Sequence, residues 1–571
     1  MKRILMVTAA LVAAVAVWIA FTIPPHRQAL PVFDAGTVPG VVHIHTNRSD
    51  GLSGPDEIAA AAARAGLKFV VLTDHGDATR TPAPPIYRSG VLCLEGVEIS
   101  TNGGHYLALD MPASPYPLAG EARDVVEDVR RLGGFGIVAH PDSPKPQLQW
   151  RDWTTRFDGV ELLNPDTSWR VLAAQPGWSA KLRLLNGLLG YAFRPVESMA
   201  AMIQPTGVLL QWEALAERRR VVVMAGADAH ARLALRSGAE LAQGRYVLPL
   251  PGYESSFELL SIRVRPEAPL SGDAVTDGRL IMRAIRAGHL HTVIDGLASP
   301  AAFEFSATNE HGTVHEGDEI SAAGSLALHV RTNAPPDFTT VIHEGIRTLA
   351  AQRGAEDWTV HATGEPAVFW VEILSGGRPT PVTWLRSNPI YVRGDRPTEG
   401  EPIHAASDPV SRPLFDGASP LGWAVEHDAD SQASVNVTSI GGGKELEWAY
   451  RLADTPGTRQ TAVLVVDTPD GIAQFNRLSF TVRSDHPMRV SVQFRGGIGP
   501  GPEDRWQRSV FVDRSTQVRS VNFDDVTPVG PTRTVAPPLE QIRNILFVVD
   551  RTNAKAADAG HLWITRAELQ H

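Results

Sequence analysis

The sequence is poor in cysteine and has no excess of positive charge. Cys93 is the only thiol among 571 residues, so no disulfide can form within one chain, and stability must come from packing and bound metal. The net charge is −10, with 53 Lys and Arg against 63 Asp and Glu. The chain therefore lacks the broad basic field of a protein that binds a nucleic acid polymer, and we expect no such partner.

The N-terminal segment is the one long apolar stretch that suggests a membrane. Lys2 and Arg3 precede about 20 uncharged, mostly apolar residues, which is enough to span a bilayer as a helix. A small-x-small cleavage site is poorly formed, so we interpret residues 4–23 of the segment 1–24 as an uncleaved anchor, with secretion after signal cleavage as the alternative. The positive-inside rule then places the rest outside the cytoplasm, in the periplasm or at the cell surface. Residues 25–39, rich in proline and small residues, are expected to form a tether.

A chain of this length should hold about three domains of ~100–200 residues each. Over residues 40–297, continuous apolar runs such as KFVVLTDH alternate with helical segments such as PDEIAAAAARAG, which Ser53 could cap. Such runs are typical of strands buried on both faces of a parallel sheet. The pattern predicts an α/β fold, a (β/α) barrel, with a helical insertion at about 165–219 and a closing helix at 278–288.

Within the insertion, residues 182–193 read LRLLNGLLGYAF. This stretch is too short to span a membrane. Flanking Arg183 and Arg194 indicate a helix that is either packed on the protein or interfacial, and we favour packing.

The C-terminal half changes to alternating patterns with frequent turns. Residues 298–394 predict an immunoglobulin-like β-sandwich, the Pro-rich stretch 395–413 a linker, and residues 414–571 a second all-β module, a jelly-roll sandwich. The last module vaguely resembles galactose-binding or carbohydrate-binding jelly rolls, so carbohydrate is a candidate ligand. Core positions are nevertheless the safer interpretation of its tryptophans Trp423, Trp448, Trp506 and Trp563, because a small sandwich needs large apolar side chains.

The stretch VVHIHTNRSDG, residues 41–51, concentrates potential metal ligands. Val42 and Ile44 alternate with His43 and His45, so both imidazoles should project from one face of a strand, about 7 Å apart. A lone HxH motif is more often structural, with hydrogen-bonded histidines. The rest of the chain must therefore decide between the two interpretations.

Acid and imidazole groups recur at or just beyond the ends of the other predicted strands, where (β/α) barrels build their active sites. The nine candidate ligands are His43, His45, Asp50, His75, Glu98, His105, His140, Asp228 and His230. Nine ligands are too many for one four-coordinate zinc ion. Two or three divalent ions fit better, and ligands of this mixed softness accept Zn, Mn or Fe.

This set resembles the PHP (polymerase and histidinol phosphatase) superfamily of metal-dependent hydrolases. The similarity covers residues 41 to about 297 and consists of HIH with SDG, then TDH, GVE, AHP and GADAH, in the family's order. It implies a distorted (β/α)₇ barrel of PHP type. It also implies three ion positions: His43, His45, Glu98 and Asp228; Glu98, His105 and His140; Asp50, His75 and His230.

Clustered divalent ions favour hydrolysis of phosphoesters, because they lower the pKa of a bound water to supply hydroxide and neutralise charge on a phosphoryl transition state. We expect a metal-dependent phosphoesterase acting on a small phosphorylated molecule or a phosphorylated glycan or lipid head group. His140, Asp228 and His230 are the candidate catalytic residues. The alternatives are a carbamate or ester hydrolase on the same metal site, or a glycan-binding surface protein with a vestigial barrel.

The motifs also contain carboxylates and cations outside the nine candidate ligands. Glu95 lies on the opposite strand face from Glu98, so only one can point at the metals, and Glu98 is nearer the strand end. Asp74 has the same parity relation to His75 and is expected to orient a ligand imidazole. For a non-reacting phosphate, the candidate substrate-binding residues are Arg48, Lys145, Asn164, Arg232 and Arg236, each of which could instead be a solvated charge or, for Asn164, a turn residue.

Four histidines outside this set are assigned no metal: His289, His291, His315 and His343. His289 and His291 repeat the HxH spacing, but no acid or imidazole partners follow at comparable strand ends, so we expect them to be structural. VHEGDE at 314–319 and His343 are expected to be solvated loop positions.

Overall fold

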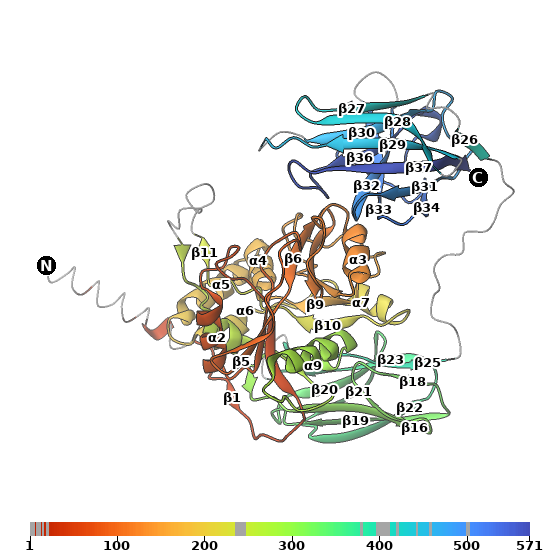
Figure 1. The fold of residues 1–571 in the computed structure, drawn as a ribbon. Coiled ribbons are helices and arrows are strands. Elements are labelled where there is room, and N and C mark those ends of the chain that lie inside the picture. The colour runs from red at the N-terminus through yellow and green to blue at the C-terminus, as the bar shows by residue number, and fades with distance from the viewer. Residues whose placement is uncertain are drawn as a thin grey trace. The chain divides into compact units, whose positions relative to one another are not determined.

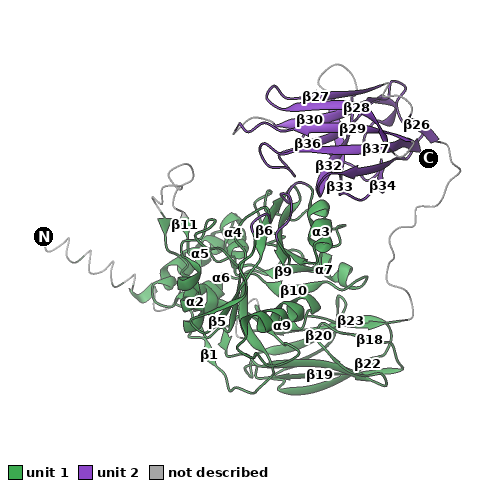
Figure 2. Cartoon of the chain, in the orientation of Figure 1, with its two compact units in different colours: residues 1–77, 81–112, 121–400 green, residues 78–80, 113–120, 401–571 purple. Residues whose placement is uncertain are grey.

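In the computed structural model the chain forms two compact units (Figure 2). Unit 1 comprises residues 1–77, 81–112 and 121–400, and unit 2 comprises residues 78–80, 113–120 and 401–571. The structure describes residues 6, 13, 16–18, 22–234, 247–376, 381–394, 411–417, 422–440, 443–455, 460–497 and 503–571. Most of the expected anchor, Arg236 and most of the expected linker lie outside the described residues. Among those described, no helix combines the length and apolar character needed to cross a membrane.

Two sheets in unit 1 carry the candidate site (Figure 1). Their strands are short apolar runs that are buried on both faces, as the sequence indicates. One sheet has the order β10 (Val222–Ala225), β9 (Gly159–Leu163), β8 (Phe135–Val138), β7 (Gly104–Leu109) and β6 (Val97–Thr101). The other contains the neighbours β14 (Leu290–Val293), β13 (Ser261–Val264), β2 (Val38–Ile44), β3 (Phe69–Leu72), β5 (Val91–Glu95) and β4 (Ile86–Arg88).

The two edge strands of the five-stranded sheet, β10 and β6, meet the other sheet at the ends of its interior strands β2 and β3. Isolated parallel bridges join Ile44 to Ala229 and His75 to Glu98. The pairs β2·β3, β3·β5, β8·β9 and β9·β10 are parallel, whereas β6·β7, β7·β8, β2·β13 and β13·β14 are antiparallel. The α/β class is thus confirmed with a mixed strand direction, and the distorted (β/α)₇ barrel stays a prediction.

Helices follow the expected positions with small differences at their ends. Helix α2 begins after Gly54, which makes no side-chain cap, so Ser53 does not cap it as expected. The closing helix α9 begins after Asp273, whose side chain accepts from Thr276 N, and ends at left-handed Gly288. The helices are α2 (Pro55–Arg64), α3 (Ala122–Arg131), α4 (Pro165–Ala174), α5 (Trp178–Tyr191), α6 (Pro195–Met202), α7 (Leu209–Ala216), α8 (Tyr253–Leu259) and α9 (Ala274–Ala287). Helices α4 to α7 form the predicted insertion.

The expected separate sandwich from residue 298 is not separate. Strand β14 pairs antiparallel with β24 (Thr383–Ser387), so the sheet of the first domain continues through β24 into β23 (Ala367–Leu374), β25 (Ile390–Arg393) and β18 (Glu319–Ser321). Pairing with β24 covers the unpaired edge that β14 would otherwise expose. The hydrophobic core is shared as well, since Val293 and Phe303 belong to one cluster.

The remaining strands of this region complete its two layers. A four-stranded sheet has the order β17 (Gly312–His315), β16 (Phe303–Asn309), β19 (Ser325–Thr332) and β22 (Asp357–Thr363). On the continuous sheet, β20 (Thr339–Glu344) pairs with β23 and with β21 (Arg347–Arg353). Two short pairs join β1 (Gln28–Ala29) to β15 (Ala298–Ser299) and β11 (Leu233–Ala234) to β12 (Val247–Leu248).

The expected tether at residues 25–39 is bound to unit 1. In addition to the β1·β15 pair, Asn333 donates a hydrogen bond to the Pro31 carbonyl, and the Arg331 guanidinium lies 4.2 Å from the Phe33 ring. The proline and small residues of this stretch predict a loose linker, but its backbone pairs with β15 and accepts a hydrogen bond from Asn333. The chain is therefore docked from residue 24 onward rather than free.

Unit 2 is a two-sheet antiparallel sandwich, as predicted from its alternating strands. One sheet has the order β28 (Gln432–Ile440), β29 (Gly443–Arg451), β37 (Ala559–Gln570), β31 (Arg477–Ser484) and β34 (Gln517–Asn522), with β26 (Ser411–Phe415) on β37. The other has the order β27 (Trp423–His427), β30 (Thr461–Asp467), β36 (Ile542–Asp550), β32 (Met488–Gly496), β33 (Asp504–Val512) and β35 (Thr527–Pro528). Trp423, Trp448 and Trp506 are buried in the core between them. Trp563 is half-buried and lies under the Arg483 guanidinium.

Candidate metal centre

The first histidine of the HxH motif occupies a bulge in β2. His43 has a φ of 67°, and the register between β2 and β3 shifts between Val42 and Ile44. A bulge changes the direction of neighbouring side chains, and a non-glycine residue with positive φ is held there only by its surroundings. The rings of His43 and His45 are consequently 5.2 Å apart between centroids, closer than the ~7 Å expected from a regular strand.

Glu98 on β6 is the centre of the site. Its side chain is 1% exposed. Five imidazoles lie within 3.3 Å of its two oxygens: His105 and His140 at Oε1, and His43, His45 and His75 at Oε2. Predicted ligands from four different chain segments therefore converge on one carboxylate.

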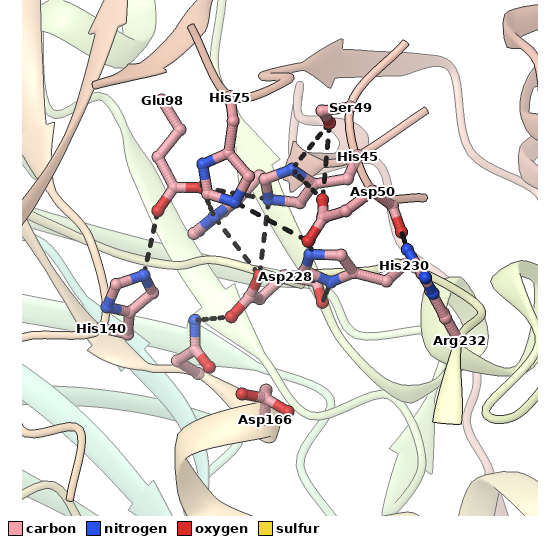
Figure 3. Close-up of polar contacts among 12 residues, drawn as sticks. His45, Ser49, Asp50, His75, Glu98, His140, Asp166, Asp228, His230 and Arg232 are labelled. Atoms are coloured by element: carbon pink, nitrogen blue, oxygen red, sulfur yellow. Dashed lines mark hydrogen bonds and ion pairs between the residues drawn. The ribbon is translucent and has the colours of Figure 1, made fainter. Parts of the chain in front are cut away.

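Two aspartates complete the cluster. Asp228, which follows β10 with a φ of 48°, has its Oδ1 atom 3.4 to 3.5 Å from nitrogens of His43, His45 and His230. Asp50 lies on the more open side, with its side chain 44% exposed, and its Oδ1 atom is 3.3 Å from His230 Nε2. Figure 3 shows the labelled imidazoles and carboxylates pointing toward one another.

The donor geometry fits divalent metal. In the described part of the chain, the groups whose donor atoms lie within 4.8 Å of one another are His45, Asp50, His75 and His230; His43, Glu98 and His140; His43, His45 and Asp228; His75, Glu98 and His105. Ligands of a tetrahedral ion at ~2.1 Å are about 3.4 Å apart, and His45 Nε2 lies 3.1 and 3.5 Å from Glu98 and Asp228 oxygens. This nitrogen is buried without a hydrogen bond. All nine predicted ligands fall into these groups, so the residues fit two or three ions.

Opposite charges dominate the electrostatics of the cluster. Burial acts to raise the pKa of Glu98, but His43, His105 and His140 outweigh it and hold that pKa well below its usual range. Burial acts to lower the pKa of His230, but Asp50 and Asp228 raise it to about 9, and the pKa of Asp50 falls to about 2. Without metal, the raised pKa values of His43, His45, His140 and His230 favour protons on these imidazoles, which balance the carboxylates. Metal ions would replace those protons, so binding should release protons.

Glu161 on β9 is a buried residue of the site that sequence reasoning missed. Its carboxylate is 2.7 Å from His43 Nδ1 and accepts hydrogen bonds from His140 N at 2.8 Å and from Asn164 Nδ2 at 3.1 Å. A carboxylate on the second nitrogen of an imidazole fixes the orientation and tautomer of the ring, so that Nε2 of His43 faces Glu98 and Asp228. The available signal was an acid inside the apolar run FDGVELL.

Asp74 acts on the loop that carries Asp50 rather than directly on an imidazole. It accepts hydrogen bonds from Thr46 N and Thr46 Oγ1 at 2.7 and 2.8 Å, and from Ser49 Oγ at 2.7 Å. Ser49 Oγ is 3.5 Å from His45 Nδ1. The expected role in orienting a ligand imidazole is therefore indirect, through the 46–49 turn.

The candidate substrate-binding residues lie around the cluster with different partners. Arg48 pairs with Glu95, and Arg232 donates to the Asp50 carbonyl at 3.2 Å, as Figure 3 shows. Lys145 is half-buried in the loop after His140. Asn164 caps α4 by accepting from Thr167 N, while its amide donates to Glu161 and, at 3.5 Å, to Asp228 Oδ2. Asn164 thus orients carboxylates of the site from inside the protein.

No family model and no curated protein sequence matches the chain. Among solved structures, a two-domain protein from Bacteroides vulgatus containing a predicted PHP-like metal-dependent phosphoesterase is 13% identical with a TM-score of 0.29, covering 63% of this chain and 99% of that one. A family 11 carbohydrate-binding module from Clostridium thermocellum, in complex with a β-1,3-1,4-mixed-linked tetrasaccharide, is 16% identical with a TM-score of 0.25, covering 29% and 96%. These are the two kinds of protein that the sequence resembles. At TM-scores this low they carry no weight for function, which must be inferred from the site.

Proposed function

We propose that the protein is a metal-dependent phosphoesterase that acts outside the cytoplasm. The observation that carries the proposal is the excess of imidazole around Glu98: five rings lie within 3.3 Å of one buried carboxylate. A buried structural carboxylate is satisfied by one or two such partners. Five imidazoles with two further aspartates make chemical sense as ligands shared by two or three divalent ions.

When bound, divalent ions would lower the pKa of a water ligand and neutralise charge on phosphoryl oxygens. The residues of the chain would hold the ions and orient the side chains that bind them. Glu161 and Asn164 orient His43 and Asp228 from the buried side of the site. Asp50, His75 and His230 lie on its solvent-exposed side, with side chains 44%, 35% and 24% exposed. If two ions are bound and His230 is left uncoordinated, it is the proposed donor of a proton to the leaving oxygen, because a partly exposed imidazole can exchange its proton with water. His140 and Asp228, which are buried, are assigned to holding metal.

The proposed substrate is a small phosphorylated molecule or a phosphorylated glycan or lipid head group. Arg232 and Lys145 are the proposed partners of a non-reacting phosphate, because both belong to loops that also carry ligands. The proposed location follows from the apolar segment 4–23 and its basic flank.

Metal content and hydrolysis test the proposal together. Full-length protein purified in detergent is analysed by mass spectrometry for metal and assayed on a phosphomonoester and a phosphodiester, with and without added Mn. We expect two or three ions per chain and a metal-dependent rate that His43→Ala abolishes. An undiminished rate in metal-stripped protein or in His43→Ala would refute the proposal.

Two outcomes would support the alternatives. Bound metal without cleavage of either phosphoester would favour a carbamate or ester hydrolase. No bound metal, together with binding of a polysaccharide by the full chain, would favour a glycan-binding protein with a vestigial barrel.

A further inference from the structure

Helix α5 presents its large apolar side chains to solvent. Ordinary surface helices bury such residues and expose polar ones. Here the exposed side chains, with their exposed fractions, are Trp178 84%, Leu182 50%, Leu185 42%, Leu188 55%, Leu189 37% and, just after the helix, Phe193 60%. The spacing 178, 182, 185, 189 follows one face of a helix. The packed position expected for residues 182–193 is confirmed for Leu184 and Tyr191, which pack against the core. It is wrong for the exposed residues Leu182, Leu185, Leu188, Leu189 and Phe193.

The side of α5 that faces the protein combines small residues with Leu184 and Tyr191, which are partly buried against the core. Its fully buried members are Ala180, Gly187 and Gly190. A Cβ on Gly187 would lie 2.3 Å from the Met202 sulfur, and one on Gly190 would lie 2.5 Å from Ser198 Oγ. Both contacts are with α6, which Figure 1 labels beside α5. Close approach to α6 thus fixes which face of α5 points inward, and the apolar face must point outward.

The charge on α5 has one sign. The helix WSAKLRLLNGLLGY contains Lys181 and Arg183 and no acidic residue. Both basic side chains are exposed and donate to backbone carbonyls, Lys181 to Ala173 O and Arg183 to Ala201 O. An apolar stripe flanked by basic residues is the composition of a helix that lies in a membrane interface with anionic lipid.

The N-terminal segment joins unit 1 next to the same helix. Arg194, at the end of α5, donates to the Pro24 carbonyl, and the Pro24 ring lies near Gly190. Arg27 N donates to Glu197 Oε1 at 3.2 Å, and the Arg27 guanidinium is 3.5 Å from Glu258. The chain that follows the apolar segment 4–23 is therefore held against α5 and α6 from residue 24 onward.

We propose that the outer face of α5 docks on the lipid bilayer beside the N-terminal anchor, parallel to an anionic phospholipid surface. Fourteen residues of helix are about 21 Å long, too short to cross the ~30 Å hydrocarbon core but suited to lie in its boundary. The docked chain at residue 24 brings this face to the membrane whenever residues 4–23 are inserted. The inference rests on the proposed anchoring and is independent of the hydrolase chemistry.

A spin label at position 185 of the full chain tests the proposal. Burial raises the pKa of the Cys93 thiol to about 11, so a maleimide label reacts selectively with Leu185→Cys. The matched control is Ile346→Cys, which is 70% exposed in the β20–β21 hairpin of the same unit, away from α5 in Figure 1. Both chains are reconstituted in phosphatidylcholine vesicles that contain phosphatidylglycerol, with metal content as the check of folding.

We expect the ratio of oxygen to nickel-chelate accessibility to be at least about fivefold higher at position 185 than at position 346, because oxygen partitions into the lipid region where α5 lies. Equal ratios at the two positions would overturn the proposal. Dipolar broadening at 185 that disappears on dilution with unlabelled protein would also overturn it, in favour of a second copy covering α5. A chain that does not float with the vesicles would refute the anchoring itself.

Quenching by brominated phosphatidylcholine gives a second measurement without cysteine chemistry. Trp178 is 84% exposed and begins the stripe. The difference between the wild-type chain and Trp178→Phe isolates its fluorescence from the other tryptophans. We expect this component to be quenched in brominated vesicles, and an unquenched component would overturn the proposal.

Discussion

Two HxH motifs in unit 1 have the same spacing but different neighbouring side chains. His43 and His45 open onto Glu98 with three further imidazoles, whereas His289 and His291 each meet one acid. His291 Nδ1 is 2.9 Å from Glu316 Oε1 with both side chains buried, and His289 Nε2 is 2.8 Å from Asp318. The prediction that His289 and His291 are structural agrees with this pairing. The expectation that VHEGDE is a solvated loop is wrong for Glu316, which is 1% exposed.

His343 extends the comparison. It was expected in a solvated loop, but it belongs to β20, its ring stacks on Trp370 at 3.9 Å, and its Nε2 atom is 3.2 Å from Glu372. Burial of a histidine beside an acid is thus common to the structural and the candidate metal sites. The useful difference is the number of imidazoles around one acid, because Glu316 and Glu372 each face a single histidine whereas five rings surround Glu98.

The sharpest test of this difference compares Glu98→Gln with Glu316→Gln. Both acids are buried beside histidine, and glutamine keeps the shape of each. We expect Glu98→Gln to lose metal and at least about 10³-fold in phosphoester hydrolysis, because charge on the shared ligand is removed. Glu316→Gln should keep both, since glutamine can still accept from His291. Metal analysis and initial rates measure the effect, and equal losses in the two variants would contradict the distinction.

The His343 pair should stabilise the fold without metal. Burial acts to raise the pKa of Glu372, but His343 and Arg386 outweigh it and lower that pKa from 4.5 to about 2. A lowered acid pKa contributes stability above pH 4.5, and this contribution is lost as pH falls toward 2. The contribution is roughly 3 kcal/mol at neutral pH. Urea unfolding across this range should show a shallower pH dependence for Glu372→Gln.

The control for that experiment is Glu356→Gln, at an exposed position of the same β region. It should leave the pH dependence as in the wild type. A wild-type slope in Glu372→Gln as well would show that the acid lability comes from other groups.

Glu161 occupies an intermediate position in the comparison, since it pairs one-to-one with a histidine that also faces Glu98. We expect Glu161→Gln to weaken metal affinity by roughly 10–100-fold, because the partner that orients His43 is altered. Cobalt titration followed by absorbance measures both the affinity and the ligand geometry. An unchanged affinity and spectrum would show that the bulge in β2 alone orients the ring.

The sequence was most informative where chemistry and periodicity coincide. The glycine after the α9 pattern marked the end of that helix, and acids or imidazoles at or just beyond the predicted strand ends marked the nine candidate ligands. In the structure Glu98 and His105 lie instead near the starts of β6 and β7. Three features depend on tertiary contacts that periodicity does not contain: the inward face of α5, the β14·β24 pair and Glu161. A stripe of apolar residues shows that one helix face differs from the others, but only the small residues against α6 decide that the stripe faces outward.

The smallest expected effect concerns Glu95, three residues before Glu98. Alternation along one strand predicts opposite faces for the two carboxylates, but this reason is wrong: Glu95 ends β5 and Glu98 lies on β6, in different sheets. Glu95 accepts from Ala83 N at 2.8 Å and pairs with Arg48. We expect Glu95→Gln to change metal affinity by less than about twofold, because neither Ala83 N nor Arg48 is a candidate ligand and an ion pair with a partly exposed arginine contributes little. If Arg48 binds substrate, the KM should change while the metal content stays constant. Loss of metal in this variant would mean that the 46–50 loop, which carries Asp50, is held by the Arg48–Glu95 pair as well as by Asp74.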